Sequence, residues 1–286
     1  MPDSSISITP SPGLYIVATP IGNLGDLTLR AATVLKSADV IAAEDTRVTA
    51  KLLRHLGARV PLVAYHDHSD AAVRDALVAR AASEVVALVS DAGTPLISDP
   101  GYKLVRDARA AGRQIVTLPG PCAAIAALTL AGLPTDRFLF AGFLPSKAKA
   151  RGDAIAELAG VRATLVFYES GPRLGAALAA LAAGLGSREA AVARELTKLY
   201  EECVTGTLGE LAARYADAPP KGEIVVVVAP PPSDAAEDGD DEAIDAALAR
   251  ALDTLPVAKA AKAVAARFGR DRSDIYARAL ALKGGA

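Results

Sequence analysis

The sequence has no tryptophan, only 4% aromatic residues and only two cysteines, Cys122 and Cys203. Two cysteines cannot form a disulfide framework or a four-cysteine zinc site, so we expect a reducing compartment, the cytoplasm. The apolar residues, 51% of the chain, are mostly alanine, valine and leucine, a composition that suits helices packed on a parallel sheet. Such a chain can bury a large core and is not intrinsically disordered.

Long hydrophobic runs are also absent. The longest helical apolar stretch, Cys122 to Leu133, is shorter than the ~20 residues that a membrane-spanning helix needs. The first residues, 1–5, contain neither a basic segment nor an apolar one, which argues against a signal peptide. We therefore expect no contact with a membrane.

The chain has no large excess of either charge, since it contains 31 basic and 33 acidic residues. This balance excludes a uniformly basic nucleic-acid-binding protein, so any contact with nucleic acid has to come from a local patch. Residues 256–286 provide one, with seven basic side chains and two acidic ones. The residues before them, 233–253, have eight acidic side chains and one arginine.

Short apolar runs alternate with helix-like stretches, an order that is typical of α/β domains. In a first domain, 13–133, the runs are continuously apolar, which predicts a parallel sheet. The strands expected in this domain are 14–18, 40–43, 62–65, 85–89 and 115–118, and the helices lie near 28–37, 47–55, 70–82 and 100–111.

A second α/β domain, 134–229, shows the same alternation. The strands expected in it are 138–143, 163–168, 190–193, 202–205 and 224–229, and the helices are 149–160, 172–184 and 207–216. Two strand-like pieces around a short turn within 195–209 predict that this sheet is mixed.

The flanking segments differ from both domains. Residues 1–12 are expected to be a disordered tail, and residues 230–242 a linker rich in proline and aspartate. Residues 243–286 are expected to form a small helical module. In it, two short helices around a tight turn, with excess positive charge, resemble a helix-turn-helix. The alternative is a helical cap that docks on the body of the protein.

Loops of small and polar residues follow the strands of the first domain, at the end of an open sheet where ligands bind. Pro20, Gly22, Asn23 and Gly25 follow the first strand, and the glycines allow close approach of the backbone to a ligand. This loop is not a dinucleotide fingerprint, and the chain has no P-loop lysine motif. The loop 90–101 combines carboxylates with small residues, which suits an amine or a ribose.

Charged residues also stand at strand ends. Asp45 and Arg47 follow the second strand, and Glu169, Lys198 and Glu223 lie at strand ends of the second domain. Charges directly beside an apolar strand are costly unless they are paired or exposed in a cleft. Helix capping and surface ion pairs are credible explanations for each residue taken alone.

Two further features have simple structural interpretations. His66, Asp67 and His68 resemble a metal-ligating cluster, but only one other histidine exists, so we expect a solvated loop and no metal. Cys122 has no evident base beside it, so we expect a packed residue rather than a nucleophile.

Eight segments in a fixed order resemble the tetrapyrrole methylase superfamily of S-adenosylmethionine (SAM) enzymes. They are LYIVATPIGNLGDLT (14–28), AEDTR (43–47), SDAGTPLISDPG (90–101), LPGPCAA (118–124), FAGFLPSK (140–147), FYESGPR (167–173), ARELTK (193–198) and KGEIVV (221–226). The likeness is closest to the branch that methylates the ribose 2′-hydroxyl of a cytidine in 16S ribosomal RNA.

This resemblance implies two α/β domains with SAM in the cleft between them, a homodimer, and a substrate in the decoding region of the small ribosomal subunit. It also implies that the basic terminal helices are the family's terminal module, although the linker 230–242 is longer than the family's. The SAM-binding residues that it implies are Pro20, Gly22, Asn23, Gly25, Asp91, Gly93, Thr94, Gly120, Cys122, Ala123 and Glu223.

Methyl transfer from a sulfonium to a ribose oxygen depends on positioning and gains from a base. Asp45, Glu169 and Lys198 are the candidate catalytic residues. A lysine can be the base only if burial depresses its pKa; otherwise it holds a phosphate or stabilises a developing alkoxide. The expected RNA contacts are Arg47, Lys259, Lys262, Arg267 and Arg270.

Three other functions stay open from the residues alone. The first is SAM-dependent methylation of a tetrapyrrole or another small molecule. The second is a non-catalytic RNA-binding or ribosome-assembly factor. The third is a metal hydrolase built on His66 and His68.

Overall fold

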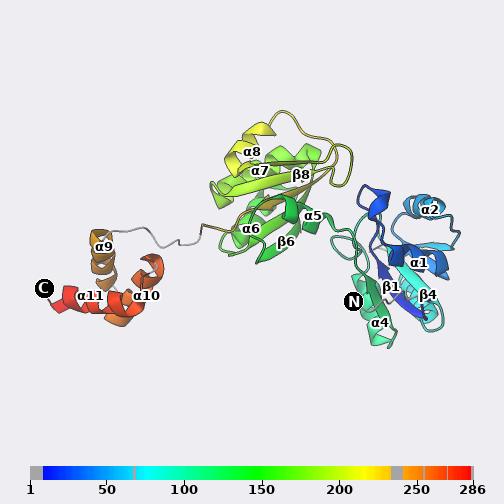
Figure 1. Cartoon of the computed structure of the whole chain (residues 1–286), viewed down its shortest axis with the longest axis horizontal. Helices are drawn as coiled ribbons and strands as arrows, with labels where there is room; N and C mark the ends of the chain where they lie inside the picture. The colour runs from blue at the N-terminus through cyan, green and yellow to red at the C-terminus, as the bar shows by residue number, and fades with distance from the viewer. Residues whose placement is uncertain (1–8, 67–68, 233–240, 254, 269, 285–286) are drawn as a thin grey trace. The chain divides into compact units, whose positions relative to one another are not determined.

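The computed structural model describes residues 9–66, 69–232, 241–253, 255–268 and 270–284 (Figure 1). The chain divides into two compact units, one of residues 1–158 with 164–229 and one of residues 159–163 with 230–286. The first unit contains two five-stranded sheets, and the described part of the second unit contains helices but no strand. The predicted fold class, two α/β domains followed by a helical module, is confirmed.

The first sheet is entirely parallel, with the strand order β3-β2-β4-β1-β5. Its strands are β1 (Gly13–Val17), β2 (Val40–Ala43), β3 (Leu62–Ala64), β4 (Val85–Val89) and β5 (Ile115–Leu118). Its helices are η1 (Leu24–Asp26), α1 (Leu29–Ser37), α2 (Thr46–His55), α3 (Ala71–Arg80) and α4 (Tyr102–Ala110). Every strand and helix expected in 13–118 is present.

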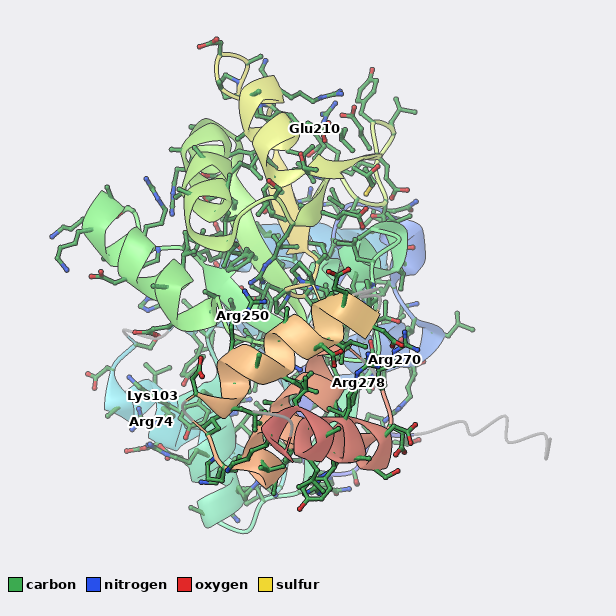
Figure 2. The ribbon with its side chains drawn as sticks, turned by 90° about the vertical axis from the view of Figure 1, so that its left-hand side faces the viewer. Arg74, Lys103, Glu210, Arg250, Arg270 and Arg278 are labelled. Atoms are coloured by element: carbon green, nitrogen blue, oxygen red, sulfur yellow. The ribbon has the colours of Figure 1, made fainter. Side chains whose placement is uncertain are left out.

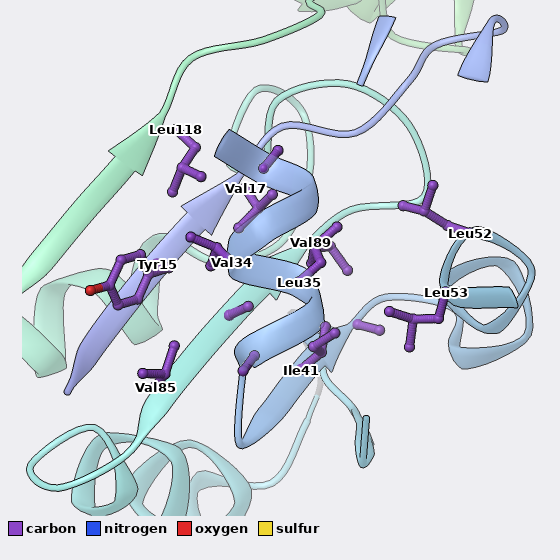
Figure 3. Close-up of a cluster of buried hydrophobic side chains, with 14 residues drawn as sticks. Tyr15, Val17, Val34, Leu35, Ile41, Leu52, Leu53, Val85, Val89 and Leu118 are labelled. Atoms are coloured by element: carbon purple, nitrogen blue, oxygen red, sulfur yellow. The ribbon is translucent and has the colours of Figure 1, made fainter. Parts of the chain in front are cut away.

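Helices cover both faces of this sheet, which explains why its central strands are continuously apolar. On one face Leu35 of α1 is fully buried in a cluster with Ile41 and Val89 (Figure 3). On the other face Leu104 of α4 packs in a cluster with Leu88. The core fixes the carboxyl ends of the strands, where the polar loops begin.

The second sheet is mixed, as predicted, with the order β6-β7-β10-β8-β9. β6 and β7 are parallel, and the other neighbours are antiparallel. The strands are β6 (Phe138–Phe143), β7 (Thr164–Ser170), β8 (Glu189–Arg194), β9 (Glu202–Thr207) and β10 (Glu223–Val228). The helices are α5 (Ala123–Leu130), α6 (Ala148–Leu158), α7 (Gly171–Leu185) and α8 (Leu208–Arg214).

One detail of the prediction for this sheet is wrong. The stretch 195–209 holds one strand, β9, rather than two, and the other strand of the hairpin is β8. Residues 195–201 form the turn, because Glu195 and Thr197 have positive φ angles that an extended strand cannot contain.

The second unit consists of α9 (Asp241–Leu252), α10 (Val257–Phe268) and α11 (Arg272–Gly284). Ile244, Leu248, Val264, Phe268 and Ile275 form its core. Residues 1–8 of the expected tail and 233–240 of the expected linker lie outside the described residues. Among the helices described, none is both long and apolar enough to cross a membrane.

An arginine holds the first and last helices of this unit together. Arg278 of α11 donates to the carboxylates of Asp245 over 2.5 Å and Asp241 over 2.7 Å, both on α9 (Figure 2). These bonds raise the pKa of Arg278 above its usual value. The positive charge of Arg278 is therefore neutralised within the unit.

Candidate active site

The loops that follow β1 and β4 are held together by backbone hydrogen bonds. The N–H of Thr19 donates to the carbonyl of Gly93 over 2.8 Å, and the N–H of Gly93 donates to the carbonyl of Thr19 over 3.0 Å. Gly93 has a φ of 81°, and a Cβ on it would lie 3.2 Å from Ile21. The conformation and the close approach together account for glycine at this position.

Asp91 joins the loop after β4 to the loop after β2. Its carboxylate accepts the backbone N–H of Asp45 over 2.9 Å. Asp45 in turn caps α2, because its carboxylate accepts the N–H of Arg47 over 2.8 Å and pairs with the Arg47 guanidinium over 2.6 Å. The bonds from Arg47 lower the pKa of Asp45 to about 2. Asp45 is therefore ionised and already engaged at neutral pH.

A cavity of about 440 Å³ lies at this end of the first sheet, and residues of both sheets line it. Its volume falls in the range of small-molecule sites. The first α/β domain contributes Ile21, Glu44, Asp91, Ala92, Gly93, Thr94, Ile97, Ser98 and Asp99, and Ala123 at the start of α5 also lines the cavity. The second sheet and its loops contribute Phe143, Tyr168, Glu169, Ser170, Glu195, Leu196, Lys198, Gly222, Glu223, Ile224 and Val225.

Carboxylates dominate the charge of this lining. They belong to Glu44, Asp91, Asp99, Glu169, Glu195 and Glu223. Among the described residues of the lining, Lys198 carries the one basic side chain. The charge of the cavity therefore favours a cationic or hydrogen-bond-donating ligand and disfavours a phosphate.

Glu169 is the most buried of these carboxylates, with 4% of the residue exposed. Its Oε1 accepts the N–H of Ser170 over 2.9 Å and pairs with Nε of Arg173 over 3.2 Å. Its Oε2 is buried and has no hydrogen-bond partner within the described part of the chain. Leaving a buried acceptor without a partner is costly, so this oxygen is expected to accept from a ligand in the cavity.

Lys198 is fixed at the cavity by two neighbours. Its Nζ donates to Oε1 of Glu195 over 3.0 Å. Its Cγ packs against Gly22, where a Cβ would come within 2.6 Å. A loop of the first domain and a loop of the second domain therefore meet at this lysine.

Backbone strain is concentrated in the loops that line the cavity. Among the described residues, the non-glycine positions with positive φ are Leu96 (76°), Ser98 (62°), Glu195 (51°) and Thr197 (63°). Conformations of this kind cost about 1–3 kcal/mol each and occur mostly at functional sites. Their clustering makes this cavity the candidate active site.

Asp99 is half-buried on the cavity wall. Burial is the main reason why its pKa rises to about 6, and the negative charges of Glu44, Asp91 and Glu223 raise it further. A hydrogen bond with Ser90 acts in the opposite direction. A carboxyl group with this pKa can exchange a proton near neutral pH.

Tyr168 contributes an aromatic surface beside α5. Its phenol oxygen accepts the N–H of Ala124 over 3.3 Å. Phe140 and Phe143 pack edge-on against its ring, with centroids 4.8 and 5.7 Å away. Burial raises the pKa of Tyr168 above its usual value, so the phenol stays neutral.

Comparison with known proteins places these features in a family. Residues 13–212 match the tetrapyrrole (corrin/porphyrin) methylases. This chain belongs to the tetrapyrrole methylase family. Residues 238–283 match a second family, the RsmI C-terminal HTH domain.

Individual members of the methylase family are similar over nearly the whole chain. Ribosomal RNA small subunit methyltransferase I of Erythrobacter litoralis is 59% identical over 273 residues, 96% of each chain. The protein of the same name from Escherichia coli O157:H7 is 47% identical and covers 95% of this chain and 96% of its own. The crystal structure of a uroporphyrin-III C-methyltransferase from Thermus thermophilus, complexed with S-adenosylhomocysteine, has a TM-score of 0.52 at 24% identity, covering 75% of this chain and 96% of its own. This structural similarity shows the fold alone.

The methylase fold brings many of the expected site residues to one cavity. Asp91, Gly93, Thr94, Ala123, Glu169, Lys198 and Glu223 line it. Pro20 and Gly22 line a neighbouring cavity of about 220 Å³, which shares Asp91.

The other expected residues lie outside both linings. Asn23 caps η1, where its side chain accepts the N–H of Gly25 over 2.9 Å. Gly120 lies against Ala18, from which a Cβ would be only 2.8 Å away, and Cys122 precedes the first residue of α5. The SAM-binding and catalytic roles of all the expected residues, those in the linings included, stay predictions.

Residues that the sequence did not single out also belong to the cavity. Asp99 is the second aspartate of the 90–101 loop. Nothing in the sequence pattern indicates whether it lines a cavity or lies on the surface. Tyr168 lies directly beside Glu169, and Glu195 lies three residues before Lys198, both of which were chosen for their charge. Only the packing of the two sheets shows that all three face the same cavity.

The expected RNA contacts are exposed where the structure describes them. Lys259, Lys262 and Arg270 are exposed on the helical unit. The side chain of Arg267 lies outside the described residues. The Arg47 side chain is 87% exposed although it pairs with Asp45.

No group of three or more metal-ligating side chains occurs in the described part of the chain. Asp67 and His68, which belonged to the cluster considered in the sequence, lie outside that part.

Proposed function

We propose that this chain is a SAM-dependent methyltransferase of small-subunit ribosomal RNA. The observation that carries the proposal is the 59% identity, over 96% of each chain, to a ribosomal RNA small subunit methyltransferase I. The similarity covers 96% of each chain and therefore includes both the methylase domain and the terminal helical module.

The cavity suits SAM. SAM carries a sulfonium and an ammonium group against one carboxylate, so a lining of six carboxylates and one lysine attracts it. The buried Oε2 of Glu169 and the carboxylate of Asp91 would accept hydrogen bonds from its amine or ribose hydroxyls. Gly93 would allow the backbone to lie close to it.

When bound, SAM supplies a methyl group activated by a positively charged sulfur. The residues of the chain have to orient the acceptor oxygen, exclude water and remove a proton. Lys198, held by Glu195, is suited to stabilise negative charge that develops on the acceptor oxygen. Asp45 is suited to position the α2 loop, since its carboxylate is bonded to Arg47.

The acceptor in this proposal is the ribose 2′-hydroxyl of a cytidine in the decoding region of 16S ribosomal RNA. The eight ordered sequence motifs support it, because they resemble the branch with that activity. We further propose that the assembled small subunit is the substrate and that the enzyme acts in the cytoplasm, where such subunits are found.

We also propose a homodimer. The support comes from the eight motifs, because the family that they resemble implies a homodimer, and the largely exposed Leu29 and Leu199 are candidates for the surface that a partner would cover. Sedimentation of the full chain should give a dimer, and a monomer at micromolar concentration would contradict this part of the proposal.

A tetrapyrrole is a less suitable substrate for this cavity. Tetrapyrroles such as uroporphyrin carry several carboxylates, which the six carboxylates of the lining would repel. The similarity to a uroporphyrin methyltransferase is at 24% identity and concerns the fold.

Mass spectrometry of 16S ribosomal RNA from a deletion strain tests the proposed function. One ribose-methylated cytidine should lose its methyl group, and the intact gene should restore it. A Lys198→Met gene should not restore it, whereas a gene with an exposed lysine changed on the first domain, Lys36→Met, should. An unchanged methylation pattern in the deletion strain would refute the proposal.

A further inference from the structure

Asp99 occupies a position in the cavity that the proposed function has not yet used. It follows Ser98, whose φ of 62° fixes the direction of the chain at the cavity wall. Ser90, at the end of β4, makes a hydrogen bond with its carboxylate. The side chain of Asp99 therefore has one hydrogen-bond partner, Ser90, while it remains part of the lining.

Charged and titratable groups face Asp99 from several elements. Glu44 at the end of β2, Asp91 after β4 and Glu223 at the start of β10 place negative charge near it. Tyr168 of β7 also senses the charge of Asp99, because that charge helps to raise the pKa of the phenol. Glu169, Glu195 and Lys198 complete the titratable groups of the described lining.

We propose that Asp99 accepts the proton of the target hydroxyl during methyl transfer. This inference rests on the function proposed above. It assigns the base to a residue that lines the cavity, is oriented by a neighbour and is not neutralised by an ion pair in the described structure.

Four of the other carboxylates already make contacts within the chain, and Glu223, at the start of β10, is exposed to solvent. Asp45 is bonded to Arg47 and is outside the cavity lining. Oε1 of Glu169 pairs with Arg173, and Glu195 pairs with Lys198. Asp91 already accepts the N–H of Asp45. A base needs a free lone pair in the cavity and a pKa that allows it to take and release a proton.

The step balances in atoms and charge. The hydroxyl oxygen forms a bond to the methyl carbon, the carbon–sulfur bond breaks with its electron pair left on sulfur, and the O–H proton moves to a carboxylate oxygen of Asp99. The sulfur loses one positive charge as Asp99 gains one proton. The total charge within the cavity therefore does not change during the reaction.

This balance links proton binding by Asp99 to the charge of the ligand. A cation in the cavity stabilises the carboxylate, so Asp99 should be ionised while the methyl donor is bound. Loss of that cation returns its pKa to about 6, and the proton is then released at neutral pH. By reciprocity, protonation of Asp99 weakens binding of the cationic donor more than binding of the neutral product.

Calorimetry of the full-length protein tests this link without measuring activity. SAM binding near pH 6 is titrated in two buffers of different ionisation enthalpy. We expect the wild type to release a substantial fraction of one proton, and Asp99→Asn to bind SAM but release none. We also expect S-adenosylhomocysteine to release less than SAM. An exposed carboxylate elsewhere, Asp75→Asn, is the matched control and should behave like the wild type. Equal proton release by Asp99→Asn and the wild type would overturn the inference.

Turnover on the small ribosomal subunit gives the second measurement. Asp99→Asn should lower kcat by ~10²-fold or more, and the fall in kcat on the acidic side of the wild-type pH profile should disappear. If the wild type methylates the subunit and the Asp99→Asn variant is equally active, the inference about Asp99 is overturned while the proposed function stands. A wild type that binds SAM but does not methylate the subunit overturns the proposed function and, with it, the inference.

Discussion

Gly22 lies so close to Lys198 that a Cβ on Gly22 would come within 2.6 Å of Lys198 Cγ and 2.9 Å of the Leu196 carbonyl oxygen. Separations this short are not tolerated between carbon atoms of neighbouring side chains, and the backbone oxygen cannot move aside cheaply. The loop after β1 therefore contributes to the cavity in two ways, directly through Ile21 and indirectly by setting the position of Lys198 on the opposite wall.

We expect Gly22→Ala to displace Lys198 and to lower both turnover and stability. The cost in unfolding free energy should be about 1–3 kcal/mol, as for other overpacked positions. Gly152→Ala is the matched control, because a Cβ on Gly152 in α6 meets nothing within 4 Å. The control should be as stable as the wild type or more so, since alanine favours a helix. Thermal unfolding and a methylation assay measure both effects, and a Gly22→Ala variant as active as its control would contradict this account.

Asp91 gives a prediction about SAM binding. Asp91→Ala removes both a cavity charge and the acceptor for the Asp45 N–H, whereas Asp91→Asn removes the charge and keeps an acceptor oxygen. A hydrogen bond to a charged acceptor contributes about 1.5–3 kcal/mol, so Asp91→Ala should weaken SAM binding by roughly ten- to a hundredfold and more than Asp91→Asn does. Titration calorimetry decides this, and unchanged affinity in both variants would exclude Asp91 from the site.

Substitutions of the three residues first expected to act in catalysis should have different effects on kcat and on SAM affinity. Lys198→Met should lower kcat strongly with little change in SAM affinity, because its charge faces the cavity. Glu169→Gln should weaken SAM binding as well, since Oε2 is the atom left for a ligand. Asp45→Asn should be nearly silent in kcat, because asparagine also caps a helix well. Steady-state kinetics at saturating SAM test all three, and a large kcat loss in Asp45→Asn alone would reverse the assignment.

The sequence predicted the fold well because its signals were local. Continuous apolar runs such as Val85–Val89 could only be strands covered on both faces, and they are. The error in the stretch 195–209 has a local cause too. Thr197 is β-branched and favours a strand by propensity, yet it adopts a φ of 63° because the turn around the cavity requires it.

The site was predictable only in part, because it depends on contacts between distant segments. Asp91 and Lys198 belong to conspicuous motifs, and both line the cavity. Asp45 belongs to an equally conspicuous motif but is bonded to Arg47 outside the lining. Asp99 was not singled out, because its raised pKa arises from burial and from carboxylates on other strands. Sequence shows which residues are charged, and packing decides which of them share a cavity.

Asp99 also predicts how stability depends on pH. Its pKa rises from 3.8 to about 6 on folding, so the folded protein binds this proton more tightly than the unfolded chain does. The contribution of Asp99 to the free energy of unfolding is fully present below pH 3.8 and is lost as the pH rises through about 6. Asp99→Asn, which cannot ionise, should therefore be more stable than the wild type at neutral pH. Because solvent screens this half-exposed carboxyl, we expect a gain of about 1 kcal/mol. Urea unfolding at neutral and acidic pH measures it, and a gain that does not shrink at acidic pH would contradict the explanation.

The last prediction concerns how RNA is held. The cavity lining is acidic and cannot attract phosphates, whereas residues 256–286 carry seven basic side chains against two acidic ones. Of these, Arg278 is neutralised by Asp241 and Asp245, so its substitution should affect the stability of the helical unit rather than RNA binding. The exposed Lys259, Lys262 and Arg270 are suited to contact phosphates.

Neutralising Lys259, Lys262, Arg267 and Arg270 together should weaken binding to the small subunit without changing SAM affinity. Because binding to phosphates releases counterions, the slope of log affinity against log salt should fall by roughly one for each phosphate that the variant no longer neutralises. The matched control neutralises four exposed basic residues of the first α/β domain, Lys36, Arg54, Arg59 and Arg109, and should change the slope less. Filter binding over a range of salt concentrations measures both slopes. If the two variants lose affinity equally, the helical module has no special role in binding, and the subunit must be held by the α/β body. If only the first variant loses affinity and slope, the module is the RNA-holding surface, since the acidic cavity can bind a nucleoside but not its phosphates.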